Sequence, residues 1–408
     1  MNKKKLISIF MVIFIISNLC GCKSESKENA GQKEINICIN IQDRDAETLL
    51  NYIKNEYEKK YPMNKININT AMNLDDISEG FNKEKYDMAL TERTSIIELS
   101  RNGLICDISQ IIENNKIEDR YFNSLVYCGI YGNKNYGLGI VPFPVEIVYN
   151  KKLLDKMDIK EPKNIEEFYK IVEKLNFQGK KIPVILPEYL DIYSILFTSI
   201  FNNMYYLNNF AEYYDSKNKY LDFSNEIQKN FNYINELYRK KIIKKDTFFN
   251  ISVEQLQDLN YNETPIMIAT FNKRQTQDSE LIKDYEVFDF GNSFRNVIMY
   301  NPLICVGNNS LEKDEIKNFI KYIYSDEFQK KLCQQKYYTA NVKLNKEFGS
   351  SYKKIVLNHI AYANKRNLNL YCNIPSKLSK EIKLKIYDIL DGKYNGLEWK
   401  NAIRSVYK

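Results

Sequence analysis

Isoleucine alternates with polar or small residues in the run Ile35-Asn36-Ile37-Cys38-Ile39-Asn40-Ile41. This period of two predicts a β-strand with one face buried. Asp45 can cap the helix that follows, in which an apolar stripe runs from Leu49 to Tyr57. Pro62 ends that helix, and a second strand opens at Ile66–Ile68. The order strand, helix, strand indicates a sheet covered by helices.

The same alternation continues along the chain. Asn164 is predicted to cap a helix, and the apolar residues Ile316, Phe319, Ile320 and Ile323 have helical spacing. Further strands are predicted at 86–90, 182–186 and 265–271. We therefore expect an α/β protein in which each sheet is mostly parallel and flanked by helices.

Length and composition narrow the choice of function. A chain of 408 residues suits two domains, and 44% hydrophobic residues can form a sizeable core. A single histidine excludes sites built from several histidines, and the eight cysteines form no CxxC pair typical of zinc sites. No cofactor, metal or nucleotide motif is present, so we predict no cofactor and no metal. The charges are mixed in sign along the chain, which argues against nucleic acid as a partner.

The first residues are typical of an export signal. Lys3–Lys5 precede an apolar run to Leu19, which is shorter than a membrane span. The sequence Leu19-Cys20-Gly21-Cys22 resembles a bacterial lipobox, which implies a signal peptide at 1–21 and acyl chains on Cys22. Residues 22–34 then form a polar tether outside the cytoplasmic membrane. The six later cysteines are predicted to be buried free thiols.

Several segments, in order, resemble the extracellular solute-binding proteins of ABC importers, in the sugar-binding family similar to maltose-binding protein. They are Lys85–Asp87, Asn102–Ile108, Gly137–Pro142, Ile147–Lys151, Glu161–Phe168, Pro265–Ile268 and Ser325–Gln329. The sequence departs from the family pattern at two positions that matter for the ligand. Ile165 stands where the family motif has tryptophan. A second expected tryptophan is also missing, and Phe271 is the aromatic residue nearest to its place. The resemblance therefore does not fix the ligand class.

This resemblance implies two lobes, each an α/β unit, joined by crossovers and a hinge, in a type II periplasmic-binding-protein-like fold. We expect the first lobe to comprise 36–141 plus about 296–337, and the second about 145–292 plus 340–408. A ligand would then bind in the cleft between the lobes, where loops at the carboxyl ends of the strands collect.

Candidate ligand-binding residues follow predicted strands or lie at the crossovers. They are Gln42, Asp43, Arg93, Phe143, Glu188, Tyr189, Phe271, Asn272, Arg274, Arg295 and Tyr337. Each has an alternative interpretation: helix entry for the first two, hinge packing for Phe143, and an ordinary turn or loop for the others. Trp399 lies in an apolar helical stripe and is predicted to belong to the core, and His359 is expected to be packed or at the surface.

The side-chain chemistry suits a polar solute. Amide, carboxylate and guanidinium groups pair with sugar hydroxyls, and tyrosine or phenylalanine rings pack on the apolar face of a pyranose. Arg93, Arg274 and Arg295 acting together would instead favour an anion.

We thus expect a lipid-anchored, monomeric receptor that captures a small solute, most readily a carbohydrate, and delivers it to an ABC permease. It would not be an enzyme. The alternatives are a ligand-sensing lipoprotein that partners a membrane kinase and, less favoured, a surface hydrolase or an adhesin, since acidic pairs for glycoside hydrolysis are recognised only in three dimensions.

Overall fold

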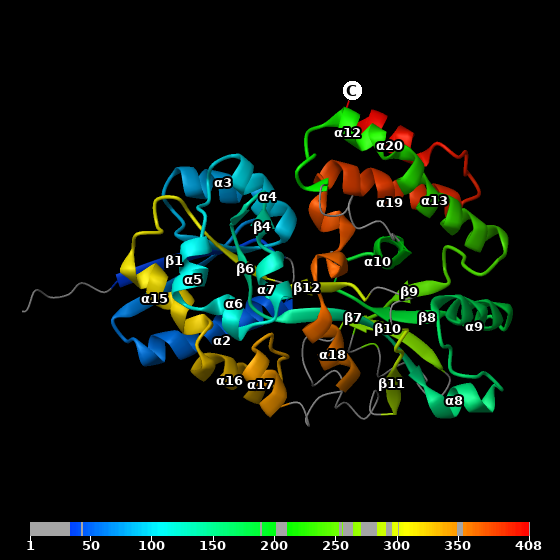
Figure 1. The fold of residues 1–408 in the computed structure, drawn as a ribbon, viewed down its shortest axis with the longest axis horizontal. Helices are drawn as coiled ribbons and strands as arrows, with labels where there is room; N and C mark the ends of the chain where they lie inside the picture. Colours follow the sequence, from blue (N-terminus) through cyan, green and yellow to red (C-terminus); the bar gives the residue numbers. More distant parts are fainter. Residues whose placement is uncertain are drawn as a thin grey trace, which may run out of the picture.

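The protein has two α/β lobes that lie side by side (Figure 1). The computed structural model describes residues 33–41, 44–187, 190–200, 210–252, 255, 264–270, 284–290, 296–300, 302–348 and 354–407. The predicted two-lobed α/β fold is confirmed. Cys22 and the predicted signal peptide and tether precede the described residues, except that the tether's last two residues fall within the first strand.

The first lobe is built on a five-stranded sheet with the order β2-β1-β3-β13-β6. The alternating isoleucines from Ile35 to Ile39 lie in β1, which pairs in parallel with β2 on one side and with β3 on the other. The odd-numbered isoleucines of β1 are buried against the covering helices. The strands are β1 (Lys33–Ile39), β2 (Asn64–Thr70), β3 (Met88–Thr91), β6 (Leu138–Gly139) and β13 (Leu303–Val306).

Helices cover this sheet, and β4 and β5 form a separate two-stranded hairpin. The stripe from Leu49 to Tyr57 is buried, as its spacing predicts. These elements are α2 (Arg44–Lys60), α3 (Leu74–Asn82), α4 (Arg93–Arg101), α5 (Ser109–Asn114), α6 (Ile117–Arg120), α7 (Asn123–Tyr127), β4 (Ile130–Tyr131), β5 (Lys134–Asn135), α15 (Asp314–Ile323), α16 (Asp326–Gln334) and α17 (Val342–Glu347).

The second lobe is built on a sheet with the order β11-β7-β10-β8-β9, and β12 also pairs with β7. The strand predicted at 265–271 is β10, which lies at the centre of this sheet and is fully buried. The strands are β7 (Pro142–Asn150), β8 (Ile182–Ile185), β9 (Phe248–Asn250), β10 (Ile266–Thr270), β11 (Tyr285–Val287) and β12 (Ile298–Tyr300).

Helices cover the second sheet as well. Asn164 caps α9, where its Oδ1 accepts a hydrogen bond from the Glu167 amide at 2.9 Å, as predicted. Trp399 is buried in the last helix and donates through Nε1 to the Tyr220 carbonyl, so its predicted place in the core is confirmed. The helices are α8 (Lys151–Lys156), α9 (Ile165–Phe177), α10 (Ile192–Ile200), α12 (Lys217–Asp222), α13 (Ser224–Arg239), α18 (Lys354–Tyr362), η5 (Lys365–Asn367), η6 (Leu370–Asn373), α19 (Ser376–Leu390) and α20 (Glu398–Val406).

The two sheets are mixed, which corrects the expectation of mostly parallel sheets. The strands joined by helices are parallel: β1 with β2 and β3, and β8 with β9 and β10. The strands next to the crossovers are antiparallel: β13 with β3 and β6, and β7 with β10, β11 and β12. In the pairs β6–β13 and β7–β12, the chain leaves the first lobe along one strand and returns along the other, so the two strands run in opposite directions.

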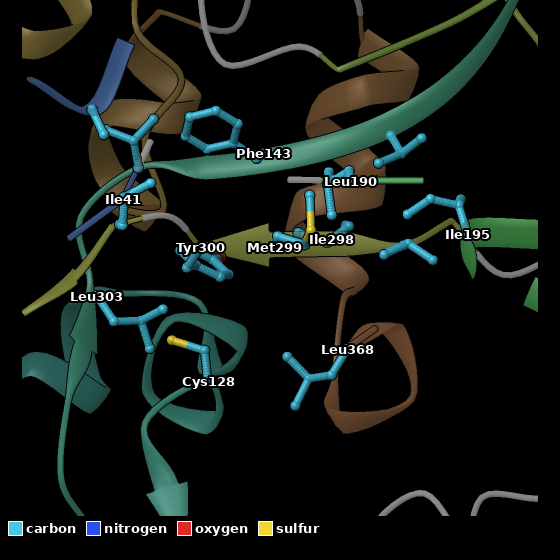
Figure 2. Close-up of a cluster of buried hydrophobic side chains, with 14 of the residues drawn as sticks. Ile41, Cys128, Phe143, Leu190, Ile195, Ile298, Met299, Tyr300, Leu303 and Leu368 are labelled. Atoms are coloured by element: carbon cyan, nitrogen blue, oxygen red, sulfur yellow. The ribbon is translucent and has the colours of Figure 1, made fainter. Parts of the chain in front are cut away.

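Two crossover strands form the connection between the lobes. In the antiparallel pair β7–β12, Pro142 lies opposite Tyr300 and Pro144 opposite Ile298. Figure 2 shows the apolar cluster at this junction, which includes Phe143, Ile41, Met299 and Tyr300. The Tyr300 hydroxyl lies 2.6 Å from Ser124 Oγ, which fixes β12 to α7 of the first lobe.

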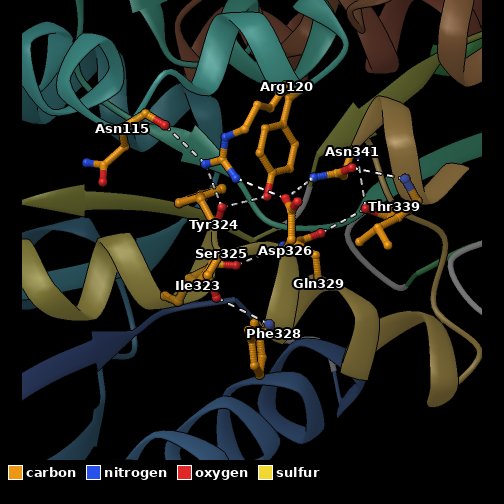
Figure 3. A network of polar contacts seen from close by, with 12 residues as sticks. Asn115, Arg120, Ile323, Tyr324, Ser325, Asp326, Phe328, Gln329, Thr339 and Asn341 are labelled. Atoms are coloured by element: carbon orange, nitrogen blue, oxygen red, sulfur yellow. Dashed lines mark hydrogen bonds and ion pairs between the residues drawn. The ribbon is translucent and has the colours of Figure 1, made fainter.

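A polar network holds the first lobe together beside the segment that follows α16 (Figure 3). Arg120 donates to Asp326 Oδ1 at 3.0 Å and to the Tyr324 carbonyl at 2.8 Å. Asn341 donates to the same Asp326 oxygen at 3.0 Å. These bonds fix residue 341, and therefore the start of α17, against the first lobe.

Candidate ligand-binding site

A cavity of about 340 Å³ lies between the two lobes. Its volume is within the range of small-molecule sites, roughly 300–1,000 Å³. The first lobe contributes the residues that follow β3, and the second lobe contributes α10, η6 and α19. The residues that line the cavity include Glu92, Arg93, Leu190, Asp191, Ser194, Ile298, Met299, Tyr300, Leu303, Leu368, Asn369, Tyr371 and Lys383.

Glu92 is the acidic group of the first-lobe wall. It follows β3 directly and precedes α4, so the carboxyl end of a central strand places it at the cleft. Its carboxylate makes no hydrogen bond or ion pair among the described residues, and burial raises its pKa. A ligand hydroxyl could donate to this carboxylate and compensate for its desolvation.

Arg93 joins the two lobes. Its Nε donates to Asn373 Oδ1 of η6 at 2.9 Å, and its Nη1 donates to the Cys128 carbonyl at 2.8 Å. The side chain is buried, and this burial lowers its pKa. These two bonds engage the guanidinium within the protein, which makes a bidentate contact with a ligand anion less favourable.

Asp191 is the acidic group of the second-lobe wall. It accepts hydrogen bonds from the Ser194 amide and hydroxyl at 3.1 and 3.0 Å, so it caps α10. Its other oxygen accepts from the Tyr387 hydroxyl at 3.1 Å and lies 3.9 Å from Lys383 Nζ. The carboxylate is therefore held in a fixed position while its residue lines the cavity.

Asn369, which caps η6, and Tyr371 within η6 bring further polar groups. Asn369 Oδ1 accepts from Thr198 Oγ1 at 3.0 Å and from the Tyr371 amide at 3.1 Å. The Tyr371 hydroxyl is buried and, within the described part of the chain, has no hydrogen-bond partner at bonding distance. It can therefore donate to, or accept from, a polar ligand.

The floor of the cavity is apolar. Ile298, Met299 and Tyr300 of β12 line it together with Leu303, Leu190 and Leu368, and Figure 2 shows these residues around the crossover. A polar wall above an apolar floor suits a ligand that has both hydroxyl groups and apolar C–H surface.

The structure places three of the predicted site residues. Arg93 lines the cavity, and its role in binding a ligand remains a prediction. Phe143 and Tyr337 are buried in the hydrophobic core and are not among the residues that line this cavity. Phe143 lies in β7 opposite Met299, where both faces of the strand are covered, in agreement with the alternative of hinge packing.

The other predicted site residues lie outside the described residues. They are Gln42, Asp43, Glu188, Tyr189, Phe271, Asn272, Arg274 and Arg295. Their roles remain predictions.

Sequence reasoning missed Asp191, Asn369 and Tyr371. One signal for Asp191 was present, because an aspartate three residues before Ser194 and shortly after a strand is typical of a helix start. The segment from Asn369 to Asn373 has no periodic pattern, since it consists of a cap and a short 3₁₀ helix. Cys38, Cys106, Cys128, Cys305 and Cys372 are free thiols, as predicted, although Cys106 and Cys372 are only partly buried.

The comparisons with known proteins agree with this geometry. The chain matches the family described as bacterial extracellular solute-binding protein over residues 42–330. No curated protein matches it.

Three solved structures illustrate the shared fold, at TM-scores between 0.63 and 0.65. A solute-binding protein of an ABC transporter from Thermotoga lettingae, bound to α-D-tagatose, is 15% identical and aligns over 92% of this chain and 98% of its own (TM-score 0.65). Maltose-bound MalE3 of T. maritima is 13% identical over 91% and 98% (TM-score 0.63). A sugar transporter protein of Arthrobacter chlorophenolicus with bound laminaribiose is 12% identical over 92% and 100% (TM-score 0.63).

The fold and the cavity between its lobes are those of a solute-binding protein. The chain belongs to the bacterial extracellular solute-binding protein family. Within the described residues, no helix is both long and apolar enough to span a membrane.

Proposed function

We propose that this protein captures a small polar solute, most readily a carbohydrate, between its lobes and delivers it to an ABC permease. The observation that supports this most strongly is the cavity itself, to which both lobes contribute polar side chains. A ligand that contacts Glu92 on one side and Asp191 or Asn369 on the other binds both lobes only when they are closed. Binding therefore shifts the population toward the closed form, which the permease would recognise.

The polar lining favours a neutral, hydroxyl-rich ligand over an anion. Glu92 and Asp191 provide acceptors on opposite walls, whereas Arg93 already donates to Asn373 and Cys128. Each buried hydroxyl that lacks a partner costs about 1–3 kcal/mol, so hydroxyl geometry would set specificity. The function requires no covalent chemistry of this chain.

We also propose that the protein is anchored to a membrane. Acyl chains on Cys22 would hold it at the outer face of the cytoplasmic membrane, and residues 22–34 would act as the tether. The lobes would comprise 36–141 plus about 296–337, and about 145–292 plus 340–408, in a monomer, except that β12 pairs with the second sheet and the start of α17 is bonded to the first lobe.

Calorimetric titration of the mature protein against mono- and disaccharides tests this function. We expect one sugar to bind with a stoichiometry of one, and small-angle scattering to show compaction when it binds. Absence of binding and of compaction across neutral sugars would contradict the proposal. Binding of a sulfate or phosphate instead would show that the solute is an anion.

A further inference from the structure

A second set of contacts joins the lobes outside the cavity. On the first lobe it comprises Ile97, Glu98 and Arg101 of α4, and on the second Ala211, Tyr214 and Asp215 of the segment that precedes α12. We call these six residues the interlobe latch. None of them lines the main cavity.

The latch combines a hydrogen bond, an ion pair and apolar packing. The Tyr214 hydroxyl donates to Glu98 Oε1 at 2.5 Å. The Arg101 guanidinium pairs with the Asp215 carboxylate and lies 5.1 Å from the centre of the Tyr214 ring. Ile97 packs with Ala211 and Tyr214 in a small buried cluster of its own.

The latch lies on the opposite side of the cavity from the hinge. The crossover strand β12 forms the floor of the main cavity, and Arg93 lies in its wall. Beyond the Arg93–Asn373 bond is a smaller cavity of about 220 Å³, which Arg93, Asn373 and Ala211 line together. The latch residues on α4 follow Arg93 by one helical turn or more. Rotation of the lobes about the crossover strands would therefore separate the latch.

Each half of the latch is fixed to its own lobe. The Tyr214 carbonyl accepts from the Tyr407 hydroxyl at 2.6 Å, and the Phe210 carbonyl accepts from the Tyr220 hydroxyl at 3.1 Å. On the other side, Ile96 and Ile97 of α4 are fully buried. Both halves must therefore move with their lobes when the cleft opens.

We propose that the interlobe latch favours the closed arrangement and so determines part of the ligand affinity without touching the ligand. This inference rests on the proposed capture of a solute between the lobes. Apparent affinity scales with the fraction of binding-competent protein, so contacts that exist only on closure tighten binding.

The three contacts should differ in how they respond to salt. The Asp215 side chain is 72% exposed, so salt screens its attraction to Arg101. Tyr214 is buried, and its burial together with its bond to Glu98 raises the pKa of the phenol, which keeps it a hydrogen-bond donor. Salt should therefore weaken the latch only partly.

The test measures the distance between the lobes of the full mature chain without any ligand. Dyes are placed at Met72 on the first lobe and Phe177 on the second, both of which are well exposed, through azide-bearing amino acids that leave the native cysteines unlabelled. Asp215→Arg places like charges together and should increase the mean distance. The double variant Arg101→Glu with Asp215→Arg restores the ion pair and should restore the distance.

Two further variants complete the test. Asp222→Arg makes the same charge change at an exposed position of α12. Asp222 forms no ion pair among the described residues, so this variant should leave the distance between the lobes unchanged. Tyr214→Phe removes only the bond to Glu98 and should lower the closed-to-open ratio by a factor on the order of two to five. Circular dichroism verifies that each variant is folded.

An unchanged distance in folded Asp215→Arg and Tyr214→Phe would overturn the proposal, as would a charge swap that fails to restore closure. Neither result depends on a ligand. A sugar screen that finds no binder would contradict the proposed function but leave the latch measurement standing.

Discussion

Arg93 and Asn373 form a hydrogen bond across the cleft, with Arg93 Nε 2.9 Å from Asn373 Oδ1. The arginine begins α4 of the first lobe, and the asparagine ends η6 of the second. Both side chains are buried. A single side chain on one lobe thus touches the other lobe, the Cys128 carbonyl and the ligand cavity.

We expect Arg93→Met to destabilise the protein by about 1–3 kcal/mol, because it leaves the Cys128 carbonyl and Asn373 Oδ1 without their donor. Urea unfolding measures the loss. Arg239→Met is the matched control, since Arg239 is exposed at the end of α13, and it should change stability by about 0.5 kcal/mol or less. Equal effects of the two substitutions would argue against a structural role for the interlobe bond.

Glu92 and Asp191 should respond differently to loss of charge. Glu92→Gln should weaken sugar binding about tenfold or more, because a charge-assisted bond to the ligand is lost, yet leave the free energy of unfolding unchanged or higher. Its carboxylate has no protein partner within the described residues, and burial penalises its charge. Asp191→Asn should lower both affinity and stability, since Ser194 and Tyr387 donate to it.

Calorimetry and urea unfolding of the two variants separate these outcomes. A Glu92→Gln protein that binds as tightly as the wild type would remove Glu92 from the site. A loss of stability equal to that of Asp191→Asn would show that Glu92 has a structural partner.

Asp87 should contribute to resistance against acid. Its carboxylate accepts from Lys313 Nζ at 2.6 Å, Ser310 Oγ at 2.8 Å and the Asn36 amide at 2.8 Å. Burial alone would raise its pKa, but these partners together lower it. The stabilisation is therefore present above the unfolded-state pKa and is lost as the pH falls through the lower folded-state value.

Asp87→Asn should accordingly destabilise the protein at pH 7, by about 1–3 kcal/mol, and much less near pH 2–3. Urea unfolding of both proteins at several pH values measures the difference. A difference that does not change with pH would contradict an ionised Asp87 in the folded protein.

Glu146 and His359 form a buried pair beside the hinge. His359 Nδ1 lies 2.9 and 3.0 Å from the two Glu146 oxygens and 2.6 Å from Asn296 Nδ2. Burial raises the pKa of Glu146. Burial alone would lower the pKa of His359, but the charge and hydrogen bond of Glu146, together with Asp289, raise it. The folded state thus binds more protons than the unfolded state.

Stability should therefore fall as the pH rises from about 5 to about 8. Over this range the folded state retains protons that the unfolded state has already released, so a rising pH favours unfolding. Thermal unfolding across this range measures the slope. The double variant Glu146→Gln with His359→Gln should flatten it. A wild-type stability that rises over the same interval would contradict the raised pKa values.

Much of the fold could be predicted because its signals are local. The alternating run at 35–41, the Asn164 cap and the helical spacing of residues 316–323 each depend on a few neighbouring residues, and each element is present. The antiparallel strands were not predicted, because the pairing of β13 with β3 joins segments about 200 residues apart. Pairing at that separation leaves no local pattern.

A cavity-lining position was predictable only where it follows a clear strand. Arg93 comes directly after the strand at 86–90 and lines the cavity, whereas Asn369 lies just before a 3₁₀ helix without periodicity and Tyr371 lies within it. Phe143 was ambiguous because a crossover strand is covered on both faces, so its side chain has no solvent-facing alternative. The single tryptophan was assigned to the core from its helical stripe, and it packs there.

We expect one solute to be held by side chains of both lobes at once. The most direct test is calorimetric titration of the wild type, Glu92→Gln and Asp191→Asn with one disaccharide. That disaccharide is one found to bind in the titrations against mono- and disaccharides. We predict binding with a stoichiometry of one for the wild type and weaker binding for both variants. Binding that neither substitution weakens, or that only one lobe's variant weakens, would show that the sugar is not held between the lobes.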